Sequence, residues 1–251
     1  MIGNNKVLAV ITARANSVGL PQKNYREFCG KPLIEWSILA AVKSKYIDFI
    51  TISSNCPHVK DVSLEFIKNY NSIHGKDAKK VYFIDRPNEL ATPISKNEEA
   101  LIHAAQWLEE KYEENPKYIV NLQPTSPLRK KYLIDDCLEK LYDSGLKSLL
   151  TVSEHTPLVI QVDSNGNIKW HFDRLNRKMR QDFSPEELYL NDDGCLYITE
   201  SNVLFDELCR LDSHPFVYLN NKYSSYQIDT DDDFIILEAI KKQLDKSNQY
   251  I

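Results

Sequence analysis

The sequence lacks the features that mark several other classes of protein. Its 251 residues contain no apolar run near the roughly 20 residues that span a bilayer. Its five cysteines are odd in number and form no CxxC pair, which excludes a zinc-ribbon site or a disulfide framework. Met1–Lys6 enters a strand-like run directly, without the pattern of a secretory leader. We therefore expect reduced thiols in a soluble, cytoplasmic protein without a membrane partner.

An excess of positive charge is also missing. The chain has 31 Lys and Arg against 36 Asp and Glu, a net charge of −5, and no basic stripe. Nucleic acids require clustered cations that neutralise their phosphates, so we expect no nucleic-acid partner. An anionic small substrate remains compatible with this balance, provided that a few cations gather in one cleft.

Strand-like and helix-like segments alternate through about the first 150 residues. Short apolar runs predict strands, and apolar residues at helical spacing predict the helices between them. The predicted strands are Lys6–Ala13, Asp48–Ser54, Lys80–Ile84, Tyr118–Leu122 and Ser148–Val152. The predicted helices start at Pro32 and span Val59–Tyr70, Asn97–Tyr112 and Tyr132–Tyr142. This order predicts an α/β, Rossmann-like fold, with a mainly parallel sheet covered by helices on both faces.

The alternation is interrupted at about residues 154–190. Two short strand-like pieces, Val159–Val162 and Ile168–Phe172, flank an Asn165-Gly166 turn, and a basic stretch follows. The pattern resumes with strands at Cys195–Thr199 and Phe216–Leu219 and a closing helix from about Asp232 to Leu244. We interpret the chain as one domain, residues 1–251, with an inserted arm that mediates dimerisation. A two-stranded hairpin is only marginally stable alone, so we expect a homodimer.

The loop after the first strand carries two cations, Arg14 and Lys23, together with Gly19. A triphosphate needs backbone N–H groups in a concave loop and fixed positive charge. The loop is neither the GxxxxGK[ST] phosphate loop nor the GxGxxG dinucleotide fingerprint. From spacing alone, a polar surface loop is an equally good interpretation. Ligands of parallel sheets bind beyond the carboxyl ends of strands, where Arg14 and Gln123 can converge.

Six segments, in order along nearly the whole chain, resemble signatures of the acylneuraminate cytidylyltransferases, also called CMP-sialic acid synthetases. The most specific is Leu122–Arg129 (LQPTSPLR), which matches at every position. The others are Ala13–Asn24 (ARANSVGLPQKN), Arg86–Ala91 (RPNELA), Arg180–Asp182 (RQD), Asp193–Ile198 (DGCLYI) and Ile228–Thr230 followed by Asp233-Phe234. Chance does not account for six matches in the family's order.

The resemblance implies a Rossmann-like domain with an arm exchanged between two subunits. It also implies transfer of CMP from CTP to a nonulosonic or related 3-deoxy-keto-sugar acid, with Mg²⁺ bridging phosphate oxygens. By resemblance, Arg14 and Lys23 hold the triphosphate, while Asn24, Arg86 and Asn97 contact the nucleotide. Gln123 contacts the sugar acid, Arg180 approaches the reacting centre from the arm, and Asp229 ligands the metal.

Four residues depart from the family's pattern. Val18 stands where the family has Lys, and Gln227 replaces the first Asp of its "IDID" segment. Pro93 also replaces an Asp, and Asp193 replaces an Asn beside the expected sugar site. Because two of these changes remove groups that bind triphosphate or metal, two alternatives stay open. One is a nucleotidyltransferase acting on a sugar 1-phosphate, and the other is a catalytically weak homologue that binds nucleotide.

Several residues have structural interpretations that need no chemistry. Thr230 and Asp233 have the spacing of a helix-capping box, so most of the acidic run beside them is expected to be structural. His103 lies on a helix face and is expected to be packed rather than catalytic.

Overall fold

The computed structural model describes residues 1–15, 19–75, 78–247 and 249–251. The departure at Val18 lies outside these residues. The strands of the fold are β1 (Val7–Thr12), β2 (Glu27–Phe28), β3 (Lys31–Pro32), β4 (Phe49–Ser54), β5 (Lys80–Asp85), β6 (Tyr118–Leu122), β7 (Ser148–His155), β8 (Ile160–Val162), β9 (Ile168–Trp170), β10 (Tyr189–Glu200) and β11 (Phe216–Leu219). The α-helices are α1 (Leu33–Lys43), α2 (Pro57–His74), α3 (Asn97–Tyr112), α4 (Leu133–Ser144), α5 (Ser201–Glu207) and α6 (Asp231–Leu244).

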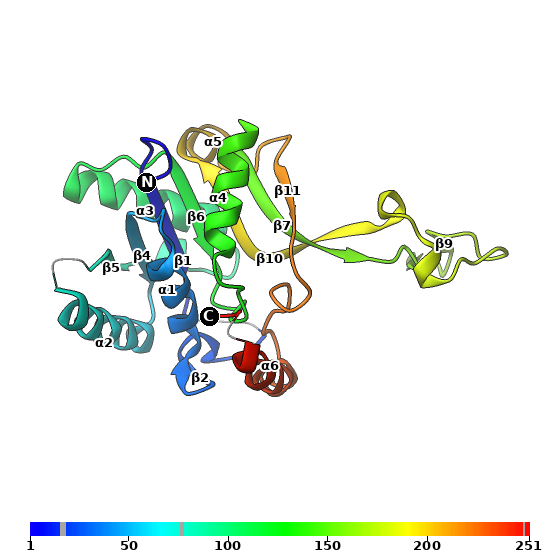
Figure 1. Cartoon of the computed structure of the whole chain (residues 1–251), viewed down its shortest axis with the longest axis horizontal. Coiled ribbons are helices and arrows are strands. Elements are labelled where there is room, and N and C mark those ends of the chain that lie inside the picture. The colour runs from blue at the N-terminus through cyan, green and yellow to red at the C-terminus, as the bar shows by residue number, and fades with distance from the viewer. Residues whose placement is uncertain (16–18, 76–77, 248) are drawn as a thin grey trace.

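A seven-stranded sheet forms the centre of the body, in the order β11-β7-β10-β6-β1-β4-β5 (Figure 1). β1 pairs in parallel with both β4 and β6, and β4 pairs in parallel with β5. β10 is the exception, because it runs antiparallel between β6 and β7. The sheet is therefore mainly parallel, as the alternation of strands and helices predicts.

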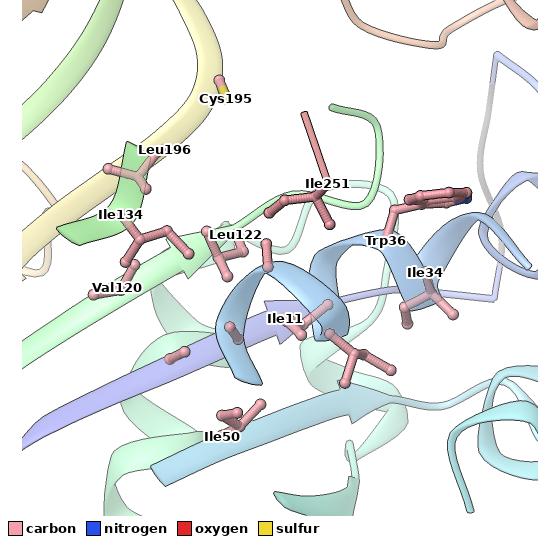
Figure 2. Packing of buried hydrophobic residues seen from close by; sticks show 14 of the residues in the cluster. Ile11, Ile34, Trp36, Ile50, Val120, Leu122, Ile134, Cys195, Leu196 and Ile251 are labelled. Carbon is pink, nitrogen blue, oxygen red and sulfur yellow. The ribbon is translucent and has the colours of Figure 1, made fainter. Parts of the chain in front are cut away.

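Side chains of β1 alternate between two hydrophobic clusters. Val7, Ala9 and Ile11 pack with residues of α1, α4 and α6, whereas Leu8 and Val10 pack with residues of α3 and α5. Figure 2 shows part of the first cluster, where α1, which carries Ile34 and Trp36, lies across the strands that carry Ile11 and Ile50. Both faces of the sheet are thus covered by helices, which explains why β1 and β6 read as continuous apolar runs.

The inserted segment projects from the body as an arm (Figure 1). Its base is a continuation of two neighbouring strands, since Tyr189 of β10 pairs with His155 of β7. Toward its tip β8 and β9 form a separate antiparallel pair, joined by a turn in which the Gly166 amide donates to the Asp163 carbonyl at 3.0 Å. Gly166 has a φ of +82°, a conformation that glycine adopts without strain. The interruption predicted at residues 154–190 is therefore an arm.

Several elements differ from the expectation, among them β2 and β3, which have no predicted counterpart. β10 begins at Tyr189, six residues before the predicted strand at Cys195, because its first residues pair with β7 at the base of the arm. α5 carries no predicted counterpart, and at seven residues it is too short for a clear apolar period. The five cysteines are free, as expected. Among the described residues, no helix combines the length and apolar character needed to cross a bilayer.

Candidate active site

A cleft of about 330 Å³ opens at the carboxyl ends of β1 and β6. It is lined by residues from the β1 loop, the loop after β5, the start of α3, the loop after β6 and the segment before α6. These are Thr12, Arg14, Lys23, Asn24, Arg86, Leu90, Thr92, Ser95, Lys96, Asn97, Gln123, Pro124, Thr125, Arg210, Gln227 and Asp229. The structure therefore brings every candidate site residue into one cleft except Arg180.

Two arginines give one side of the cleft an uncompensated positive charge. Arg86 follows β5 and is buried, and its guanidinium donates to the Ser53 Oγ at 3.0 Å and the Ser53 carbonyl at 2.5 Å. Arg14 follows β1 and donates to the Thr92 and Pro93 carbonyls at 3.2 and 3.4 Å. Burial, and secondly the charge of Arg14, lower the pKa of Arg86 to about 10. Because neither forms an ion pair with a carboxylate in the described part of the chain, the two are suited to bind an anion.

Lys23 and Asp229 form an ion pair on the floor of the same cleft. The Lys23 Nζ lies 3.0 Å from the Asp229 Oδ1 and also donates to the Ile228 carbonyl at 3.0 Å. The Lys23 side chain is only 9% exposed, whereas that of Asp229 is 67% exposed. Asp229 is positioned by the start of α6, because its amide and that of Thr230 both donate to the Asp233 carboxylate. The expected capping box is present, so this acidic run is structural apart from Asp229.

The cleft offers few ligands for a metal ion. Among the described residues, no group of three or more His, Cys, Asp or Glu side chains is arranged to hold one. Asp229 is the carboxylate that lines the cleft. This donor set fits a hard cation such as Mg²⁺ only if bound phosphates and water supply most of its oxygen ligands.

Neutral polar groups, together with Arg210, line the opposite side, along β6 and β10. Gln123 follows β6, and Thr125 donates to the Gln227 Oε1 at 3.2 Å. The side-chain amide of Gln227 donates to the Asp193 carbonyl. Asn97, at the start of α3, donates to the Asn121 Oδ1 at 2.8 Å. Gln227 therefore links the β6 loop to β10 in the position where the resemblance leads one to expect a second carboxylate.

Asp193 lies behind the cleft rather than in it. Its buried carboxylate accepts from the Thr151 hydroxyl at 2.6 Å, the Cys195 amide at 2.9 Å and the Asn220 amide group at 2.9 Å. These bonds tie β10 to β7 and to the segment after β11. The departure at Asp193 consequently affects the sheet more directly than it affects a substrate.

The sequence model of a family described as cytidylyltransferase matches residues 8–250. This chain belongs to the cytidylyltransferase family. It is 28% identical over 247 residues to the CMP-N,N'-diacetyllegionaminic acid synthase of Legionella pneumophila, covering 94% of this chain and 96% of the relative. It is 26% identical over 243 residues to a pseudaminic acid cytidylyltransferase of Campylobacter jejuni, covering 94% and 97%.

Other comparisons of this cytidylyltransferase cover a relative only in part or show the fold alone. It is 28% identical over 235 residues to an N-acylneuraminate cytidylyltransferase of Streptococcus agalactiae, spanning 92% of this chain but only 52% of that protein. The solved structure of a CMP:2-keto-3-deoxy-manno-octonic acid synthetase complexed with CTP has a TM-score of 0.65 and 16% identity. The match covers 95% of this chain and 99% of that one, and it confirms the fold.

Arg180 of the cytidylyltransferase is the candidate that the structure does not bring to the cleft of its own chain. It begins a short 3-10 helix, Arg180–Asp182, in the arm, where its side chain is exposed. The arm lies away from the body (Figure 1). Arg180 accordingly does not line the cleft of its own chain.

Sequence reasoning missed Arg210 and Lys96 among the residues that line the cleft. Lys96 directly precedes α3, and its backbone amide donates to the Glu99 carboxylate at 3.2 Å. Arg210 follows α5, in a segment without a recognised motif. The sequence signal was limited to a single arginine between two predicted strands.

Proposed function

We propose that this cytidylyltransferase transfers CMP from CTP to a nonulosonic acid or a related 3-deoxy-keto-sugar acid and releases pyrophosphate. The observation that carries the proposal is the cationic side of the cleft, where Arg14 and Arg86 have no anionic partner among the described residues. A triphosphate supplies the missing negative charge. The names of the full-length relatives support a sugar acid as the acceptor.

In the proposed reaction, the anomeric hydroxyl oxygen of the acid attacks the α-phosphorus of CTP. A new O–P bond forms, the bond from the α-phosphorus to the bridging oxygen breaks, and pyrophosphate leaves with the electron pair. The O–H bond of the attacking hydroxyl also breaks, and its proton passes to water. Arg14 and Lys23 hold the triphosphate, while Asn24, Arg86 and Asn97 orient the nucleotide. Gln123 orients the acid. Such catalysis consists mostly of positioning and charge neutralisation.

Mg²⁺ is the proposed cofactor, with Asp229 as its protein ligand. When bound, it would neutralise charge that develops on the phosphate oxygens. Asp229 is suited to this role because it is exposed to the cleft, but in this structure its Oδ1 is paired with Lys23. Metal and nucleotide are therefore expected to bind together. The Lys23 ammonium would then leave Asp229 and pair with a phosphate oxygen.

Pyrophosphate release measured with CTP tests this function against its alternatives. The acceptor panel is N-acetylneuraminate, N,N'-diacetyllegionaminate, pseudaminate, 3-deoxy-manno-octulosonate and several sugar 1-phosphates. We expect turnover with at least one acid and none with the sugar phosphates. Turnover with sugar phosphates alone would favour the first alternative. CTP binding without turnover at any Mg²⁺ or Mn²⁺ concentration would favour a catalytically weak homologue.

We further propose a homodimer in which the arm of each subunit brings Arg180 to the cleft of the other. The support is the surface of the arm, where large apolar side chains are exposed on a hairpin that no helix covers. These are Val159, Ile160, Val162, Ile168, Trp170, Leu175, Met179, Tyr189 and Leu190. A second subunit would remove this apolar surface from water.

A complementation experiment tests the exchange directly. Arg14→Ala and Arg180→Ala subunits are each expected to be inactive as homodimers. In a heterodimer one site would carry both substitutions and the other would carry neither, so random mixing should restore about a quarter of the parental activity. If Arg180 acts within its own chain, every site retains one substitution and mixing restores nothing.

A further inference from the structure

Arg210 is a cation of the cleft that the proposed triphosphate site leaves without a role. It lies between α5 and β11 and is held in a fixed orientation. Its Nη1 donates to the Glu98 Oε1 at 2.9 Å, and its guanidinium carbon lies 4.3 Å from the centre of the Tyr197 ring. The side chains of Arg210 and Glu98 are only 23% and 14% exposed. A guanidinium held by an ion pair and an aromatic face is preorganised to receive a planar anion.

One donor of this guanidinium is unused. The Arg210 Nε is buried and has no hydrogen-bond partner among the described residues. A buried donor without a partner costs free energy, so most such groups in folded proteins are satisfied. A ligand oxygen would satisfy it once the side chains that bury the Nε move aside. Two neighbouring N–H groups of a guanidinium match the two oxygens of a carboxylate.

The position of Arg210 separates it from the proposed triphosphate site. It stacks on Tyr197 of β10, which pairs with Asn121 of β6. Arg14 and Arg86 follow β1 and β5, and β6 and β10 lie on one side of β1 while β4 and β5 lie on the other. Arg210 thus belongs to the side of the cleft that contains Gln123.

The charge balance at Arg210 also differs from that at the triphosphate site. Arg14 and Arg86 have no carboxylate partner in the described part of the chain, which suits a ligand with several negative charges. Arg210 shares its charge with Glu98, so its surroundings are close to neutral before a ligand binds. Such a pair suits a single negative charge delivered by a planar group, and it disfavours a phosphate dianion.

We propose that Arg210 binds the carboxylate of the acceptor and selects an acid over a neutral sugar or a sugar phosphate. This inference rests on the proposed function, and it assigns the acid-recognising contact to a residue outside the segments that resemble the family. Arg210 acts as a specificity-determining residue, and Glu98 orients it.

The test compares the parental enzyme with Arg210→Met, using the acid that proves active in the panel and its methyl ester. In Arg210→Met we expect the KM for the acid to rise about 10- to 100-fold, while the KM for CTP changes less than about threefold. The preference for acid over ester should fall by a similar factor. Arg210→Lys should recover part of this preference, because lysine restores the positive charge but not the paired N–H donors of the guanidinium.

Substitutions at Glu98 separate recognition from stability. Arg210→Met leaves Glu98 without its partner, so the double variant Arg210→Met/Glu98→Gln serves as a charge-matched form that should recover thermal stability but not acid preference. Glu98→Gln alone should lower that preference less than Arg210→Met does, because the amide oxygen of Gln still accepts from the Arg210 Nη1. Unchanged acid selectivity in a folded Arg210 variant, or an equal loss for CTP and acid, would overturn the assignment while leaving the proposed function in place. A parental enzyme that accepts no acid would overturn both.

Discussion

At the scale of single residues, the proposed phosphate contact of Arg14 can be removed without disturbing the core. Arg14 contacts the protein through the Thr92 and Pro93 carbonyls, so Arg14→Ala should fold normally. We expect a loss of about 2–4 kcal/mol of transition-state stabilisation, roughly 30- to 1,000-fold in kcat/KM for CTP. Lys68→Ala, a change at an exposed cation on α2, is the control and should leave kcat/KM unchanged. Parental turnover by folded Arg14→Ala protein would exclude the phosphate assignment.

A second prediction at the scale of single residues concerns Asp229, the proposed metal ligand that pairs with Lys23. In Asp229→Asn a neutral amide oxygen replaces the carboxylate, so the Mg²⁺ concentration needed for half-maximal rate at saturating CTP should rise strongly and turnover should fall. The matched control is Asp232→Asn, a neighbouring exposed carboxylate in the first turn of α6. If the metal dependence of both variants equals that of the parent, Asp229 does not bind the metal and has only a structural role at the start of α6.

Gln227→Asp tests the position at which Gln227 replaces an Asp of the family's pattern. A second carboxylate at the cleft should tighten the apparent Mg²⁺ affinity in the presence of CTP. The change also removes the donor to the Asp193 carbonyl and brings like partial charges together, so we expect a loss of about 1–3 kcal/mol of folding stability. Initial rates against Mg²⁺ and urea unfolding measure the two effects. A variant with parental metal dependence would show that Gln227 does not face the metal.

The candidate site could be assembled from the sequence to the extent that its residues fall in loops after buried strands. Arg14, Arg86 and Gln123 each follow an apolar strand, and parallel strands bring such positions to one edge. Arg210 could not be found in this way, because a turn after a short helix places it and its partner Glu98 is 112 residues away. The burial of Asp193 likewise depends on contacts from β7 and the segment after β11.

At the scale of elements, the arm continues the pairing of β7 with β10. The outer part of the arm contributes no residue to the hydrophobic core among the described residues. Deleting roughly Thr156–Asp173 removes β8 and β9 and five of the nine exposed apolar side chains of the arm. We expect this deletion to convert the proposed dimer into monomer or aggregate. Sedimentation at micromolar concentration measures the change. A parental chain that sediments as a compact monomer would contradict the dimer itself.

A cleaner truncation uses the register at the base of the arm. Since His155 pairs with Tyr189, a two-residue Asn-Gly turn between them would close β7 and β10 as a hairpin. This variant should stay folded and monomeric, and it should be inactive because it lacks Arg180. The interruption of the helix–strand pattern located the arm, but the sequence could not reveal that β10 starts within it. Its first residues are exposed, and pairing with β7 rather than burial holds them in place.

At the scale of the whole molecule, a buried thiol couples folding stability to alkaline pH. Burial raises the pKa of the Cys195 thiol from 9.0 to about 11. The unfolded chain loses this proton near pH 9 while the folded chain keeps it, so stability that is complete below pH 9 is lost as the pH rises to 11. The loss approaches about 1.4 kcal/mol per pH unit, or roughly 3 kcal/mol in total.

Urea unfolding at pH 8, 9, 10 and 11 measures this loss. Cys195→Ala should be less stable than the parent at pH 8, because it leaves a small cavity. Its stability should nevertheless decline less steeply with pH, since one group that ionises only in the unfolded chain is gone. If the unfolding free energy of the two proteins declined equally with pH, the pKa of Cys195 would be the same in the folded and unfolded chains.

The antiparallel strand inside the sheet has a consequence for how the protein is made. β6 becomes an interior strand only when β10 pairs with it, and the arm postpones the synthesis of β10. At the usual rate of about 5–20 residues per second, the chain from Leu122 to Glu200 takes on the order of 4–16 s to emerge. During that interval the nascent chain exposes an apolar strand with an unpaired edge, which is a template for association with other chains. The arm thus lengthens the time for which each newly made chain must be protected from aggregation.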